Sequence, residues 1–175
     1  MSRDAAAGLV GAVFGLVFVL VNAGDLEGPW DLLVRGAGIA CIAAVTLLLF
    51  RSDAPALPTV APQAWKVYRI AVVAEVVALF AGAQVLNRTG HAGLSLPWVV
   101  VVVGVHFFPL AWAFQAPFFH VLAGTLVALG VLGGALGLAG ADRAVVSLVS
   151  GVGAGFALLA FAARPTLKTR RSAPT

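Results

Sequence analysis

Glu75 is the residue whose type and position most strongly suggest chemistry. It lies in the apolar run Ile70–Asn87, which contains no other charged side chain. If this run crosses a bilayer, the carboxylate costs at least about 2.5 kcal/mol to insert, and acids at that depth usually belong to ion paths, proton relays or paired sites. We therefore take Glu75 as the candidate titrating group. The structural alternative is a protonated side chain that only bonds a neighbouring helix.

His106 is the candidate partner of Glu75. It occupies a similar depth in the following apolar run, three residues before Pro109. Because proline has no N–H, Pro109 is expected to leave the carbonyl of Val105 without its usual helical donor and to mark a break in the helix. A carboxylate–imidazole pair could pass a proton, hold a metal or bind a polar ligand group. A histidine that only bonds a backbone carbonyl is the structural alternative.

His120 and Arg35 complete the set of candidate ligand-binding or proton-relay residues. His120 lies three residues after Pro117 and could form a second polar layer below His106. Arg35 follows Asp31 by four residues, which is the favourable order for an ion pair on a helix. That order favours a structural role for Arg35, with anion binding as the alternative.

The candidate residues do not make a convincing cofactor site. At 1.5 Å rise per residue, His106 lies about 14 Å and His120 about 5 Å from the turn between them, and this difference in depth disfavours ligation of one haem. A zinc site needs three or four ligands, and Glu75, His106 and His120 supply only a minimum at mismatched depths. The cofactor stays unknown, and no metal ligand is assigned. The sequence also contains no Walker loop, HExxH pair or nucleophile elbow, so no catalytic residue is assigned and an enzyme is disfavoured.

The composition places these residues in a membrane protein. Of the 175 residues, 61% are apolar and 10% charged, with a mean hydropathy of +1.04, whereas soluble domains are about 45–50% apolar and 25% charged. This excludes a soluble enzyme, a disordered protein and a disulfide scaffold. The net charge is +4, but the basic residues lie between apolar runs and in the tail rather than on one solvated face, which argues against nucleic-acid binding.

Six apolar runs predict an all-α transmembrane bundle. A crossing needs about 20 residues, and no segment alternates polar and apolar residues as barrel strands do. Ala5–Gly24 follows Arg3 as a signal peptide would, but equally apolar later runs favour a multipass protein and a first transmembrane helix. The expected helices are 5–24, 30–50, 66–87, 97–115, 117–139 and 143–163, arranged as three hairpins in one domain, 1–164, with a basic tail, 165–175.

The basic residues predict the orientation in a bacterial cell membrane. Eight lie on the side of both termini and three on the other, so the positive-inside rule places both termini in the cytoplasm. The tail is expected to bind anionic lipid headgroups, at about 1 kcal/mol per basic residue near the surface. Trp30 and Trp98 each follow a proline and indicate interfacial anchors.

Small residues recur at a spacing of four, as in Gly11 and Gly15 or Gly151 and Gly155. This spacing lets helix backbones approach closely in lipid. It predicts a compact bundle and leaves a homo-oligomer open.

The run Val103–Pro117, VGVHFFPLAWAFQAP, resembles a signature of the form VGxHFxPLAxxFxxP. The signature is similar to one in small bacterial, actinobacterial-type integral membrane proteins of uncharacterised activity. The resemblance covers 15 of the 175 residues and implies a six-helix bundle, but no particular activity. The shared positions that it implies are His106, Phe107, Pro109, Leu110, Phe114 and Pro117.

Three functions remain open from the sequence. The leading hypothesis is a small transporter or ligand-binding membrane protein that uses Glu75 and His106 near the midplane. The second is an interaction or assembly protein whose polar residues only pack helices. The third is a membrane enzyme acting on lipid or quinone, for which no site is recognisable.

Overall fold

The computed structural model of the protein describes residues 3–51 and 62–171. Within these ranges every regular element is helical and no strand is present. A 3-10 turn, Ala92–Leu94, leads into the fourth long helix, and a π-helical turn, Ser147–Val152, joins two helical segments into one rod. The helices are α1 (Arg3–Ala23), α2 (Pro29–Arg51), α3 (Pro62–Arg88), α4 (Ser95–Ala113), α5 (Phe118–Leu138), α6 (Arg143–Val146) and α7 (Gly153–Arg171). The described ranges thus contain six helical rods, the number that the apolar runs predict.

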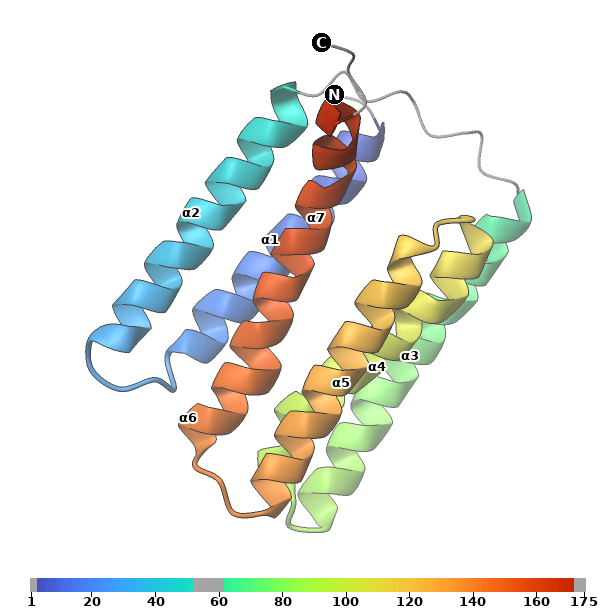
Figure 1. The fold of residues 1–175 in the computed structure, drawn as a ribbon. Coiled ribbons are helices and arrows are strands. Elements are labelled where there is room, and N and C mark those ends of the chain that lie inside the picture. The colour runs from blue at the N-terminus through green and yellow to red at the C-terminus, as the bar shows by residue number, and fades with distance from the viewer. Residues whose placement is uncertain (1–2, 52–61, 172–175) are drawn as a thin grey trace.

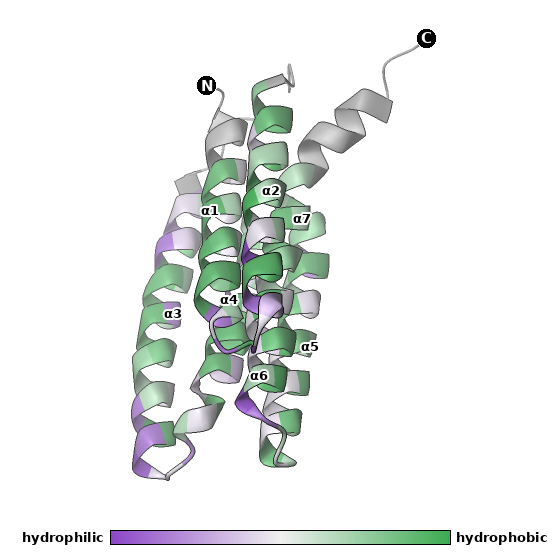
Figure 2. Ribbon diagram, turned by 90° about the vertical axis from the view of Figure 1, so that its left-hand side faces the viewer, coloured by the Kyte–Doolittle hydropathy of each residue, from purple (hydrophilic) through white to green (hydrophobic). Residues whose placement is uncertain are grey.

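Five of these rods are long and apolar enough to cross a membrane, and Gly8–Ala23 in α1 is a shorter apolar helix, among the residues described. Figure 2 shows the corresponding pattern, with hydrophobic residues along the middle of the helices and hydrophilic residues toward the ends of α3 and in the connecting segments. Because a crossing needs about 20 apolar residues, the chain is a membrane protein. The five rods are Pro29–Phe50, Gln63–Arg88, Ala92–Ala113, Phe118–Leu138 and Arg143–Ala163.

The helix boundaries differ from the predicted ones mainly at two places. α3 begins at Pro62 rather than at residue 66, because proline is well tolerated in the first turn of a helix. α7 continues to Arg171, so most of the predicted tail, 165–175, belongs to the last helix. Residues 172–175 of that tail lie outside the described ranges, as do residues 52–61 between the second and third predicted helices.

The helices form two groups of three that do not follow chain order (Figure 1). In the first group α1 packs against both α2 and α7, and in the second α4 lies between α3 and α5. The groups meet where α5 contacts α7 and the π-turn. Among the described helices, α3 packs extensively only against α4 and the 3-10 turn before it, so it lies at the edge of the bundle.

Two clusters of buried apolar side chains hold these groups together. The first joins α1, α2 and α7, and the second joins α4, α5 and α7. The second cluster is therefore the contact between the two groups. Its buried members are Val100, Leu122, Leu126, Ala154 and Leu158, and Phe18, Phe107, Phe119 and Phe161 are among the residues packed against it.

Glycines let α1 and α7 touch backbone to backbone. A Cβ atom on Gly15 would lie 2.8 Å from the carbonyl oxygen of Gly155, and one on Gly155 would lie 2.7 Å from that of Gly15. Neither position has room for a side chain unless the helices move apart. The close approach is the one that the four-residue spacing of small residues predicts.

Candidate functional site

The structure brings Glu75 and His106 together between α3 and α4. His106 Nδ1 lies 3.2 Å from Glu75 Oε2, and the two side chains are 10% and 20% exposed, respectively. The buried Nδ1 atom makes no hydrogen bond of acceptable geometry, so the two groups approach without being aligned. The separation lies within the range of about 2.7–3.2 Å for N–H···O hydrogen bonds, so the pair lacks alignment rather than proximity.

The face of α3 that meets α4 consists largely of small residues around Glu75. Ala71 is buried on one side of the acid, and Ala78 and Gly82 follow on the other at helical spacing. Small side chains let two helix backbones approach closely in lipid. Glu75 is the one long side chain among these four positions, and it therefore reaches across the interface to His106.

Aromatic side chains flank the pair at both ends of this interface. On the side where α3 begins, the ring of Phe114 lies 6.3 Å from that of Trp65 and 6.5 Å from that of Tyr68, measured between ring centroids. On the other side, Trp98 Nε1 donates a hydrogen bond of 3.1 Å to the carbonyl of Ala78. Trp98 thus lies against α3.

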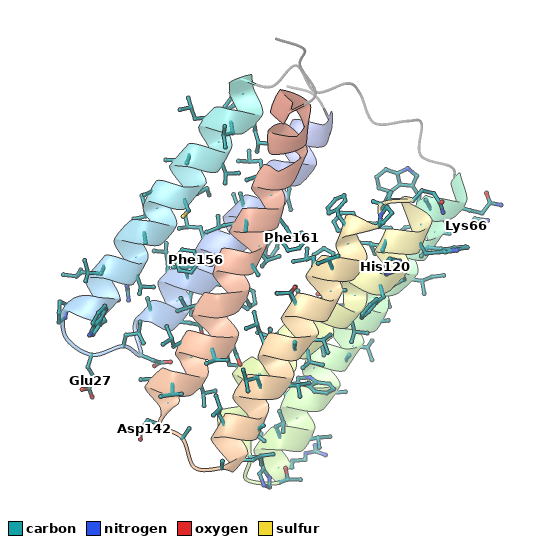
Figure 3. The ribbon with its side chains drawn as sticks, viewed as in Figure 1. Glu27, Lys66, His120, Asp142, Phe156 and Phe161 are labelled. Carbon is teal, nitrogen blue, oxygen red and sulfur yellow. The ribbon has the colours of Figure 1, made fainter. Side chains whose placement is uncertain are left out.

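His120 does not join the pair. It is exposed near the start of α5 (Figure 3), where its ring centroid lies 5.9 Å from that of Phe108. The predicted second polar layer below His106 is therefore not formed. Within residues 3–51 and 62–171, no group of three or more His, Cys, Asp or Glu side chains is arranged to hold a metal ion.

Arg35 and Pro109 both have local roles. Arg35 Nε donates to Asp31 Oδ1 one helical turn earlier, which is the ion pair that their spacing predicts. The Arg35 guanidinium also lies beside Gly24, where an added Cβ would be 3.0 Å from its nitrogen. Pro109 lies inside α4, and the helix continues through it to Ala113 rather than breaking.

A second polar cluster, at the π-turn, was missed by the sequence interpretation. Asn22, Ser147 and Ser150 are the buried polar side chains of the described residues, at 8%, 2% and 0% exposure. Asn22 donates to the carbonyl of Phe18 and packs on Gly151, and Ser150 donates to the carbonyl of Leu129. π-turns often occur at functional sites, but the polar side chains here all have partners. The only sequence signal for this cluster was the pair of serines, Ser147 and Ser150, three residues apart within an apolar run.

Asp25 links this cluster to the loop between α1 and α2. Ser147 Oγ donates a hydrogen bond of 2.6 Å to Asp25 Oδ2, and Arg143 Nε lies 3.0 Å from Asp25 Oδ1. The Ser147 hydroxyl and the Arg143 guanidinium together outweigh burial and hold the pKa of Asp25 below its ordinary value of 3.8. The carboxylate therefore ties the loop to the start of the last rod.

Comparisons with protein-family models, with curated proteins and with solved structures find no match to this chain. The chemistry of the described residues is therefore what points to a function.

Proposed function

We propose that the protein is a multipass membrane transporter in which the Glu75–His106 pair binds and exchanges a proton inside the bilayer. The observation that supports this is the 3.2 Å approach of His106 Nδ1 to Glu75 Oε2 between two membrane-spanning helices. A general acid and its partner exchange a proton at separations of about 2.6–3.2 Å. Retaining an acid at this depth is costly, and such residues usually mark ion or proton paths.

The state of Nδ1 also supports proton exchange. This buried atom lacks an aligned hydrogen-bond partner, so it is free to accept the proton of a protonated Glu75 or to donate one to its carboxylate. A histidine kept only to pack α4 would be expected to satisfy this nitrogen with a backbone carbonyl. The pair therefore has the chemistry of a relay between the α3 and α4 faces.

The direct test is proton flux in liposomes. Purified protein is reconstituted with a pH-sensitive dye inside, and a potassium gradient with valinomycin sets the membrane potential. We expect wild-type protein to change the internal pH, and Glu75→Gln and His106→Gln each to lower the initial rate at least tenfold. Glu27→Gln is the matched control, since Glu27 is an exposed acid in the α1–α2 loop. A wild-type rate in Glu75→Gln would contradict the proposal.

An assembly protein is the second candidate, and the stripe of small residues on α3 favours it. In that case the pair would only join α3 to α4, as polar side chains do between membrane helices. Wild-type protein would then give no flux above protein-free liposomes, while Glu75→Gln would still lower the temperature of unfolding. Proton flux from wild-type protein would therefore favour the transporter, and its absence would favour the assembly protein.

We further propose that α1 is a sixth crossing, that the rods form three hairpins and that both termini are cytoplasmic in a cell membrane. The distribution of basic residues supports this orientation, because such residues are enriched on the cytoplasmic side of a membrane. Lys66 and Arg69 are exposed where α3 begins, on the side where α1 begins and α7 ends (Figure 1).

The orientation can be tested by cysteine labelling. A single cysteine at Arg88, in a chain with Cys41 replaced by Ala, should react with an impermeant maleimide on intact cells. A cysteine at Lys66 should react only after lysis, and the reverse pattern would contradict the orientation.

A further inference from the structure

Trp98, on α4, contacts α3 near the Glu75–His106 pair. Its indole nitrogen bonds the carbonyl of Ala78, three residues after Glu75 on α3. At 1.5 Å rise per residue, Ala78 lies about 4.5 Å along α3 from the acid. The contact therefore acts on the same stretch of α3 that presents the carboxylate.

Gly82 makes this contact feasible. A Cβ atom at Gly82 would lie 2.0 Å from Trp98 Nε1 and 2.2 Å from Trp98 Cε2. Any larger residue at position 82 would displace the indole ring. Glycine and tryptophan thus fit together as a matched pair across the helix interface.

The position of α3 is set mainly by one neighbouring helix, α4. Among the described helices it packs extensively only against α4 and the turn before it, so no third helix sets its height or rotation. A slip of one residue along a helix moves a side chain by about 1.5 Å and turns it by about 100°. Such a slip would carry the Glu75 carboxylate away from His106.

We propose that Trp98 is a positioning residue for the Glu75–His106 pair. Its hydrogen bond to Ala78 holds α3 against α4 at the one register in which the carboxylate meets the imidazole. The inference rests on the proposed function, because it assigns a role to Trp98 in that same site. Trp98 itself touches neither the proton nor the two reacting atoms.

The test measures how strongly Glu75 and His106 are coupled. The chain is labelled with ¹⁵N-histidine in detergent micelles, and the chemical shifts of the His106 ring nitrogens are recorded by NMR at one fixed pH, with His106→Gln used to assign its signals. Because the carboxylate lies 3.2 Å from His106 Nδ1, Glu75→Gln should shift the signal of that nitrogen in the wild-type background. In a Trp98→Phe background the same substitution should produce less than half of that shift. Trp112→Phe is the matched control, since Trp112 is an exposed tryptophan on the same helix, and it should retain the full shift.

Gly82→Ala serves as a second variant if Trp98→Phe does not fold, because it displaces the indole without removing it. It should reduce the coupling in the same way. An undiminished shift in folded Trp98→Phe or Gly82→Ala would overturn the positioning role and leave the proposed transport untouched. Coupling lost in these variants, together with no flux from wild-type liposomes, would support the positioning role while refuting transport. No shift in the wild-type background would refute both the pairing and the role of Trp98.

Discussion

Asp25, a partly buried acid in the loop between α1 and α2, connects two parts of the chain that are far apart in sequence. Its carboxylate accepts a hydrogen bond from Ser147 and pairs with Arg143, although these residues follow it by more than a hundred positions. Arg143 is 85% exposed, and ion pairs of that kind contribute little. The buried Ser147 hydroxyl is therefore the stronger of the two partners.

Removal of this hydrogen bond is expected to destabilise the protein. A hydrogen bond to a charged group is worth about 1.5–3 kcal/mol, so Ser147→Ala should lower the free energy of unfolding by about that amount. The effect should depend on pH. Because the pKa of Asp25 is lowered in the folded state, its contribution is fully present above the ordinary pKa of 3.8 and is lost as the pH falls through the folded value.

The measurement is the unfolding temperature in detergent between pH 7 and pH 2.5 for wild-type protein, for Ser147→Ala, which removes the hydrogen bond, and for Asp25→Asn, which removes the charge. The gap between the wild type and each variant should be constant above about pH 5 and should become smaller as the pH falls further. Asp142→Asn is the control, since Asp142 is exposed and its side chain makes no capping hydrogen bond. A gap that does not change with pH would show that the Asp25 charge is not what stabilises the loop.

For single residues, the sequence predicted the candidate site wherever an ionisable side chain interrupts an apolar run. An acid within an apolar run was enough to single out Glu75, and the similar depth of His106 correctly suggested a partner. The exposure of His120 and the contact of Trp98 with α3 could not be predicted, for the same reason. Their surroundings depend on how a helix is rotated about its axis, and the apolar runs of this chain do not encode that rotation.

Among the elements, α1 and α7 cross with their backbones in contact. The backbones meet at Gly15 and Gly155, whereas a Cβ atom at Gly36 in α2 would meet nothing within 4 Å. Gly15→Ala should therefore destabilise the protein by about 1–3 kcal/mol, the usual cost of overpacking. Gly36→Ala should leave the unfolding temperature nearly unchanged or slightly raised. Equal effects of the two substitutions in thermal unfolding would contradict the crossing.

The spans were predictable from sequence, but their interruptions were not. Uncharged runs locate helices that must satisfy their backbone hydrogen bonds within lipid. The π-turn at Ser147–Val152 continues the helical rod without a break, and its two serines alone do not predict a change of helix type. Similarly, Pro109 is accommodated inside α4, because a transmembrane helix can tolerate proline where its neighbours compensate.

For the whole molecule, the pairing of the first and last helices is the feature open to the simplest test. A Cβ atom at Gly11 would lie 3.9 Å from the Cβ atom of Ala162, which is within the range of about 3.5–4.5 Å for disulfides. Gly11→Cys with Ala162→Cys, in a chain with Cys41 replaced by Ala, should form a cross-link under mild oxidation. The extent of cross-linking is measured as the loss of free thiols that react with a maleimide.

The control for this cross-link keeps the thiols but changes the geometry. Gly36→Cys with Ala162→Cys should remain reduced, because a Cβ atom at Gly36 has no neighbour within 4 Å. Equal oxidation of both pairs would contradict the arrangement in Figure 1. The arrangement itself could not be predicted, because every rod is apolar around much of its surface and the sequence does not say which faces meet.

The pairing of α1 with α7 also has a consequence for biosynthesis. Gly15 and Gly155 are 140 residues apart, and ribosomes add about 5–20 residues per second. The glycine face of α1 is therefore made about 7–30 s before the helix that covers it. During that interval the nascent chain has to be kept from pairing wrongly, and the completion of α7 is the event that closes the bundle.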